Sequence, residues 1–248
     1  MKSHVIGTLV AMAAAGLLAA GCQKKPESQP ASQPAARQPV AGEPAPAAAG
    51  GLVPVEISLP APLFEGTPKP VDDPQIEKPL GKRRPPFLAP PGTVNLALGR
   101  AVTSSDSAPV IGDLEQITDG KKEGTDGGFV ELGGGKQWVQ IDLGSPCTIY
   151  AVAVWHYHKQ ARAYRRVVVQ IAADQDMLSN IRTIYNSDRD NTLGLGVGKD
   201  KDYVDTHEGR LMDAGGATGQ FVRLYSNGNT ANDANHYIEV EVYGKRAP

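Results

Sequence analysis

Near its C-terminal end the chain contains Tyr237-Ile-Glu-Val-Glu-Val-Tyr-Gly244, in which apolar and polar residues alternate with a period of two. Two earlier segments, Trp138-Val-Gln-Ile-Asp-Leu-Gly144 and Gln220-Phe-Val-Arg-Leu-Tyr225, follow the same pattern. This alternation is typical of antiparallel strands with one buried face. The apolar positions predict core residues, namely Val139, Ile141, Val222, Leu224, Val240 and Val242. At a polar position of the last segment, Glu239 is the strand residue that we expect to have a further role.

Other short extended segments are separated by clusters of Gly, Asn, Ser and Pro, which favour turns. The expected strands are Val102–Ser105, Trp138–Leu143, Ile149–His156, Arg166–Ala172, Arg182–Tyr185, Phe221–Tyr225 and Tyr237–Tyr243, with a turn at Gly144-Ser-Pro146. Helical periodicity is almost absent, and we expect one helical turn within Ala173–Asn180. Many short strands with this punctuation predict an all-β sandwich or jelly roll.

With Asn95-Leu-Ala-Leu-Gly99 and Thr118-Asp-Gly120, the three alternating segments resemble the coagulation factor 5/8 C-terminal, or discoidin, domain. The resemblance covers roughly Thr93 to Lys245. It implies a galactose-binding-like jelly-roll β-sandwich over residues 93–248, which acts as a binding module. We therefore expect recognition of a ligand rather than catalysis.

The N-terminus has the features of an export signal. Lys2 and His4 precede an apolar run, Val5–Ala20, which leads into Leu18-Ala-Ala-Gly-Cys22. A basic start, an apolar stretch and small residues before a cleavage point describe a secretory signal, and the run is short of the roughly 20 residues that span a bilayer. The cysteine makes the segment similar to a bacterial lipoprotein signal, although a plain signal peptide with an incidental cysteine is the alternative.

The lipoprotein resemblance implies that residues 1–21 are removed and that Cys22 carries the lipid. We therefore expect an exported, membrane-anchored protein. Gln23 follows the cysteine, where an Asp would indicate retention in an inner membrane. An outer membrane or the cell surface is accordingly the expected location.

Two segments separate the signal from the expected domain. Residues 22–51 are mostly Pro, Ala, Gln, Ser and Gly, a composition too poor in large apolar side chains to offset ordering entropy. This predicts a disordered stalk. Residues 52–92 combine apolar side chains with many prolines and predict an extended collar, in which Val53–Leu59 forms an extra edge strand of the sandwich.

Composition and motifs restrict the function. A formal net charge of -2 argues against a nucleic-acid partner. Cys147 is the second of two cysteines, so lipidation of Cys22 leaves no intrachain disulfide, and we expect Cys147 to be packed as a small apolar residue. G-x-S-x-G, H-E-x-x-H and C-x-x-C motifs are absent, so the sequence favours no enzyme class.

The discoidin resemblance implies a structural calcium ion where an Asp-Gly loop meets the last strand. The matching carboxylates are Asp119 and Glu239, and calcium also accepts backbone carbonyls. The further expected ligands are the carbonyl groups of Gln116, Lys121 and Ile238, with an oxygen from Thr125 or Asp126. The alternative is that Asp119 caps its own turn and Glu239 faces solvent.

In this family, ligands bind to loops at one end of the sandwich, and sugar sites combine aromatic faces with Arg, His and Asn donors. Two segments concentrate these residue types. The candidate ligand-binding residues are Trp155, His156, Tyr157, His158, Arg162, Tyr164, Asn227, Asn229, Asn235 and His236. Two alternatives stay open: His156 and His158 pack inside the loop, or their i,i+2 spacing binds zinc or copper.

A long segment between Asn186 and Thr218 contains few strand signals apart from Asp202–Thr206, and we expect a specificity surface or a cover over the sandwich.

Taken together, the sequence predicts a lipid-anchored, extracytoplasmic module that binds carbohydrate at the cell envelope. The competing hypothesis is an adhesion or scaffold module whose partner is an envelope protein.

Overall fold

A computed structural model describes residues 51–63 and 73–247, all within one compact unit, Ala47–Pro248. The predicted signal peptide, Cys22 and all but the last residue of the predicted stalk lie outside the described residues. Within the part of the chain that is described, no helix is long and apolar enough to cross a membrane.

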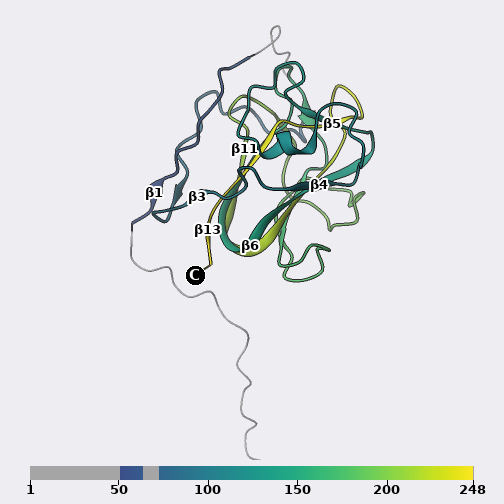
Figure 1. The fold of residues 1–248 in the computed structure, drawn as a ribbon. Coiled ribbons are helices and arrows are strands. Elements are labelled where there is room, and N and C mark those ends of the chain that lie inside the picture. Colours follow the sequence, from purple (N-terminus) through teal and green to yellow (C-terminus); the bar gives the residue numbers. More distant parts are fainter. Residues whose placement is uncertain (1–50, 64–72, 248) are drawn as a thin grey trace, which may run out of the picture. The chain divides into compact units, whose positions relative to one another are not determined.

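Two long antiparallel strands organise the fold (Figure 1). They are β6 (Lys136–Trp155) and β11 (Arg210–Asn227), and they pair with each other along most of their length. Their ladder is interrupted between Asp213 and Ala217 and between Gly219 and Phe221. Such bulges bend a strand and increase its twist. Each strand therefore contributes one half to each layer of a β-sandwich.

The remaining strands extend the two layers. One layer adds β4 (Val102–Ser104), β8 (Val168–Ala172) and β9 (Arg182–Asn186). The other adds β13 (Glu239–Arg246) and β3 (Val94–Asn95). Short pairs flank them: β1 (Val53–Pro54) with β2 (Leu88–Ala89), β5 (Val130–Leu132) with β12 (Asn235–Tyr237), and β7 (Ala163–Tyr164) with β10 (Tyr203–Val204). A 3-10 helix, η1 (Leu114–Thr118), completes the described elements.

The predicted all-β sandwich is confirmed, and so is its core. All six predicted core residues on β6, β11 and β13 have no exposed surface. They pack between the two layers with side chains such as Ile149, Ile171 and Tyr237. Cys147 is a free, fully buried cysteine within the same cluster, as its packing role predicted.

Several predicted boundaries need correction. The turn expected at Gly144-Ser-Pro146 is a bend inside β6, where Gly144 has a φ of 82°, a value that glycine adopts without strain. Tyr237–Tyr243 is divided at Ile238 into β12 and β13. Ala173–Asn180 is irregular rather than helical, because the Asp174 carboxylate accepts hydrogen bonds from backbone N–H groups at three positions within the segment.

The long segment before β11 is shorter than predicted. β11 starts at Arg210, whereas only Phe221–Tyr225 was recognised as a strand, so the irregular region ends at Gly209. The strand predicted at Asp202–Thr206 is present as the two-residue β10, which pairs with β7.

The described parts of the collar pack on the outer face of the layer that contains β13. This face carries the small side chains of Ala151 and Ala153 beside Trp155. Apolar collar residues, namely Val55, Ile57, Leu59 and Phe87, cover it. The edge strand predicted at Val53–Leu59 is therefore replaced by a short antiparallel pair, β1–β2, which lies over a face of the sandwich instead of extending its sheet.

Candidate ligand-binding site

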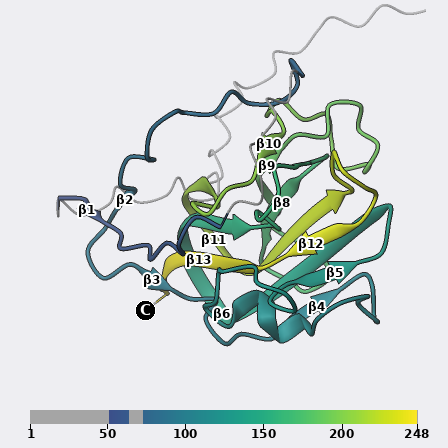
Figure 2. The same ribbon diagram turned by 90° about the horizontal axis from the view of Figure 1, so that it is seen from above.

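Short strands beside the sandwich bring distant parts of the chain together. β5 and β12 are antiparallel, and their register places His236 opposite Glu131 (Figure 2). Tyr157 follows the end of β6, and Arg162 directly precedes β7. Side chains from these segments meet in a group that we call the aromatic–arginine cluster: Phe129, Glu131, Tyr157, Arg162 and His236.

Aromatic rings form the more open side of the aromatic–arginine cluster. Phe129 and Tyr157 are half-buried and meet edge to face, with ring centroids 5.0 Å apart. The ring of His236 lies 5.7 Å from that of Phe129. The guanidinium of Arg162 lies over the Tyr157 ring, 4.7 Å from its centroid, in a cation–π contact. These are the side-chain types that the sequence predicted for a sugar site.

Two partners fix the orientation of His236. Its Nε2 lies 3.0 Å from the Glu131 carboxylate, and its Nδ1 lies 3.1 Å from the Tyr164 hydroxyl. Burial, reinforced by the charges of Arg162 and His156, lowers the pKa of His236 to about 4, so the imidazole is neutral at neutral pH. A carboxylate only accepts hydrogen bonds, hence Nε2 donates to Glu131 and Nδ1 accepts from Tyr164.

Four of the predicted ligand-binding residues are core residues in this structure. Trp155, His156, His158 and Tyr164 expose at most 1% of their surface. Because a ligand cannot touch an enclosed side chain, direct contact is left to the half-buried Tyr157 and to the small exposed parts of Arg162 (6%) and His236 (3%) among the residues of this group. Tyr164 still contributes indirectly, since it holds His236.

The two histidines pack and hydrogen-bond internally, which was the alternative left open by the sequence. His156 Nδ1 donates to Asp205 at 2.8 Å, and its ring stacks on Tyr164 with centroids 4.2 Å apart. His158 Nε2 bonds to the Lys122 carbonyl at 2.8 Å. The histidines thus have different partners, and nowhere in the described ranges do three or more His, Cys, Asp or Glu side chains gather as a metal site. Zinc or copper binding gains no support.

The asparagines shape the turn before β12. Asn235 is buried, accepts a hydrogen bond from the Gly228 N–H and donates to the Gly133 carbonyl. Asn229 bonds to backbone groups two to five residues further along the chain. Asn227 is half-buried at the end of β11. These amides fold the loop that leads to His236, and their sugar-binding role stays a prediction.

Sequence reasoning missed Phe129 and Glu131. Phe129-Val-Glu-Leu132 gives no clear period-two signal, since three of its four residues are apolar, and Phe129 directly precedes the three-residue strand β5. The segment is only four residues long and follows a glycine pair, which made it resemble a loop.

A second candidate site lies where the Thr118-Asp-Gly120 loop meets β13. Glu239 has no exposed surface. Its Oε2 accepts a hydrogen bond from the Gly120 N–H at 3.1 Å, while Oε1 is enclosed and has no partner. Burial, reinforced by Glu241 and Asp119, raises the pKa of Glu239 to about 9. An enclosed carboxylate oxygen without a partner is costly, and a cation would satisfy it.

The other predicted calcium ligands surround this oxygen only in part. Asp119 is partly exposed, accepts from the Lys121 N–H at 2.8 Å and pairs with the Lys121 ammonium at 3.1 Å, so it does cap its own turn. The Gln116 carbonyl accepts a hydrogen bond from the Asp119 N–H. Ile238 is buried next to Glu239. The unpartnered Glu239 Oε1 is therefore the atom that supports a hard cation here, and we propose calcium there.

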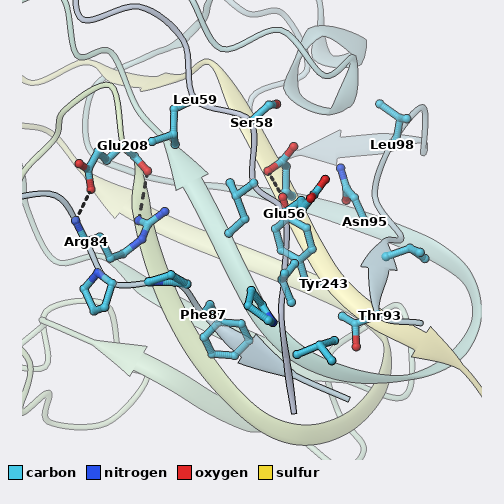
Figure 3. Close-up of a pocket in the computed structure, with 18 of the residues that line it drawn as sticks. Glu56, Ser58, Leu59, Arg84, Phe87, Thr93, Asn95, Leu98, Glu208 and Tyr243 are labelled. Carbon is cyan, nitrogen blue, oxygen red and sulfur yellow. Dashed lines mark hydrogen bonds between the residues drawn. The ribbon is translucent and has the colours of Figure 1, made fainter. Parts of the chain in front are cut away.

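The collar encloses a separate groove of about 1180 Å³ between Val53–Leu59, Arg83–Phe87 and the outer face of β13 (Figure 3). Apart from the exposed Glu56 and Arg83, its charged side chains are paired: Arg84 donates to Glu208, and Tyr243 donates to Glu241 at 2.5 Å. Lys122 pairs with Glu241 at 2.7 Å. Because these polar groups satisfy one another, we regard the groove as a packing gap under the collar, and the aromatic–arginine cluster as the better candidate site.

No family model matches the chain, and no curated protein matches it. Among solved structures, similarity is found to a family 89 glycoside hydrolase from Clostridium perfringens, with 17% identity, a TM-score of 0.47, and coverage of 62% of this chain and 15% of that enzyme. The chitosan-binding module 1 of a chitosanase/glucanase from Paenibacillus sp. IK-5 matches with 22% identity, a TM-score of 0.40, and coverage of 61% and 99%. A Streptococcus pneumoniae fucose binding module matches with 18% identity, a TM-score of 0.43, and coverage of 60% and 97%.

The calcium proposal predicts a thermal shift. Adding calcium to chelator-treated protein at about 100 times its dissociation constant stabilises the fold by about 2.7 kcal/mol, or roughly 5–10 °C for a domain of this size. Glu239→Gln abolishes the shift, because it removes the charged oxygen. Glu115→Gln, an exposed carboxylate on η1, is the matched control and keeps it. An unchanged melting temperature of the unsubstituted protein on calcium addition contradicts the proposal.

The raised pKa of Glu239 predicts a pH dependence in chelator. Between the unfolded pKa of about 4.5 and the folded pKa of about 9, the folded state holds a proton that the unfolded state has released. Folding stability therefore falls as the pH rises through this window. Urea unfolding at pH values between about 5 and 9 measures the slope, which we expect to be shallower in Glu239→Gln. Equal slopes in the two proteins exclude Glu239 as the titrating group.

Proposed function

We propose that this protein is a lipid-anchored, extracytoplasmic binding module that recognises carbohydrate at the cell envelope through the aromatic–arginine cluster. One observation carries the proposal: two half-buried aromatic rings, Phe129 and Tyr157, meet beside a guanidinium and an oriented imidazole. Aromatic surface offers packing for the apolar face of a sugar ring. The polar groups beside it offer hydrogen bonds for sugar hydroxyls.

The architecture supports recognition more than chemistry. The cluster is built from strand ends that are fixed by the β5–β12 pair, so a ligand meets a preorganised surface. The described residues include two histidine–carboxylate pairs. The first, His156 with Asp205, is enclosed by the core and out of reach of a substrate. The second pair, His236 with Glu131, has a neutral imidazole whose nitrogens are both engaged. Neither arrangement presents a free base to a ligand.

Calcium at Glu239 is part of this proposal. Glu239 pairs with Trp155 across β13 and β6, and Tyr157 lies two residues beyond Trp155. The His158 imidazole also bonds to the Lys122 carbonyl, next to the Asp119–Lys121 turn. A cation at Glu239 is therefore expected to stiffen the segment that carries Tyr157.

Membrane attachment is proposed from the sequence features around Cys22. Two or more acyl chains give durable anchoring, since each buried CH₂ contributes about 0.8 kcal/mol. In cells of a diderm bacterium that express the gene, Cys22→Ser is expected to move the protein from the membrane fraction to the soluble fraction and to abolish labelling with a palmitate analogue. Labelling that persists in Cys22→Ser contradicts lipidation at this position.

Carbohydrate binding is tested with the full chain on an array of neutral and acidic glycans, followed by titration calorimetry on the best ligand. Tyr157→Ala is expected to weaken binding about tenfold or more, because truncating an aromatic anchor typically costs more than 1 kcal/mol. Tyr150→Ala is the matched control, a half-buried tyrosine outside the cluster, and keeps the affinity.

Two outcomes contradict this function. Binding that is unaffected by Tyr157→Ala places the site elsewhere on the protein. Absence of binding to any glycan, combined with specific capture of an envelope protein, favours the scaffold hypothesis instead.

A further inference from the structure

The segment Arg162-Ala-Tyr-Arg-Arg166 contains three arginines in very different electrostatic surroundings. Arg165 lies 3.8 Å from Asp73 and 3.7 Å from Asp202. Arg166 lies 2.9 Å from Asp190, with two hydrogen bonds between their side chains. The two partly exposed arginines of the segment are thus both paired with carboxylates.

Arg162 is the most buried of the three, with 6% of its surface exposed, and it has no such partner. Its Nη2 donates to the neutral Gln160 side chain at 2.7 Å, and its Nε is enclosed without a hydrogen bond. The guanidinium also interacts with the neutral Tyr164 hydroxyl and lies over the Tyr157 ring. In the described part of the chain it forms no ion pair. A cation removed from water is costly unless a charged partner compensates it.

Two acidic side chains of the surrounding segments are hydrogen-bonded to histidines and not to Arg162. The Glu131 carboxylate accepts a hydrogen bond from His236, and Asp205 accepts one from His156. The low pKa of His236, caused by burial and by Arg162 itself, leaves its imidazole neutral. Arg162 is therefore the fixed positive charge of the aromatic–arginine cluster, located beside the half-exposed rings, and among the described residues no carboxylate lies within ion-pair distance of it.

We propose that the aromatic–arginine cluster selects glycans that carry an anionic group, a carboxylate or a sulfate ester, and that this group pairs with Arg162. The inference rests on the proposed carbohydrate-binding function and specifies its ligand class. A guanidinium presents parallel N–H donors that match the oxygens of such groups. A neutral sugar leaves the buried cation uncompensated, so the same residue rejects neutral ligands.

The test compares acidic glycans with their neutral counterparts on the full chain. Oligogalacturonides, oligoglucuronides and oligomannuronates are paired with their methyl esters, which keep the sugar rings and remove the charge. Sulfated galactose oligosaccharides are paired with the unsulfated parents, which separates the two sources of anion. We expect at least one acidic series to bind about tenfold or more tightly than its neutral form, since breaking a buried charge pair costs at least that factor.

Variants then locate the preference. Arg162→Gln is expected to bind the charged and neutral forms equally, and Arg162→Lys, which keeps the charge but not the planar fork, to retain part of the preference. Arg166→Gln makes the same change of charge at a neighbouring arginine outside the cluster and should keep the full preference. Melting curves check that each variant folds, and the acid-to-ester ratio of the unsubstituted protein decides the question even if Arg162→Gln does not.

The outcomes separate the two proposals. Equal binding of the acidic and neutral forms by the unsubstituted protein overturns this inference and leaves the carbohydrate-binding function standing. A preference that survives in folded Arg162→Gln also overturns it. If no glycan binds in any series, both proposals fail.

Discussion

The pairing of β6 with β11 is the constraint on which the rest of the molecule depends. Each strand is hydrogen-bonded to the other on both sides of its bend, so the two layers of the sandwich share one pair of strands, whose ladder is interrupted at two bulges. The position of the bend determines where β6 ends, and its last residue, Trp155, pairs with Glu239 of β13. Both candidate sites are thereby brought to one end of the same strand pair. Glu239 belongs to the proposed calcium site, and Tyr157 to the aromatic–arginine cluster.

Two buried ionisable groups dominate the functional interpretation because each has a polar atom without a hydrogen-bond partner. The Glu239 Oε1 atom is enclosed without a donor, and Arg162, with 6% of its surface exposed, has an unpartnered Nε and no anion beside it. Lys122 shows how the chain treats a buried charge that serves structure alone. Its ammonium bonds to Glu241 at 2.7 Å and to the Ser58 carbonyl at 2.9 Å, and it lies over the Trp155 ring. Compared with Lys122, Glu239 and Arg162 each lack a complete set of partners. This points to a bound cation at Glu239 and a bound anion at Arg162.

The fold could be predicted from period-two alternation, because that pattern directly records which side chains are buried. It identified the core valines of β6, β11 and β13 correctly. It failed at Gly144-Ser-Pro146, where residues typical of turns produce a bend within a strand. It also missed the start of β11, whose Ala-Gly-Gly-Ala-Thr-Gly sequence lacks the bulky side chains of a typical strand.

The candidate site was less predictable, since residue type does not reveal burial. Trp155, His156 and His158 have the chemistry of sugar contacts, yet none of them is free to bind a ligand. The collar covers Trp155, His156 bonds to Asp205, and His158 bonds to the Lys122 carbonyl. Phe129 and Glu131 join the site through the β5–β12 pair, a contact between segments about a hundred residues apart. A contact of this range leaves no local sequence pattern.

The collar has a mechanical consequence. From Val53 onward its contacts follow one another along the chain: the β1–β2 pair, then Ser58 with Lys122, and then the 73–84 segment with the loop before β11. A force that pulls the chain at Gly51 would act on these contacts one after another. Each contact that breaks would release a length of collar before the force reached the β6–β11 ladder. A protein held by its N-terminal side could therefore yield under load by releasing collar while the sandwich stays intact.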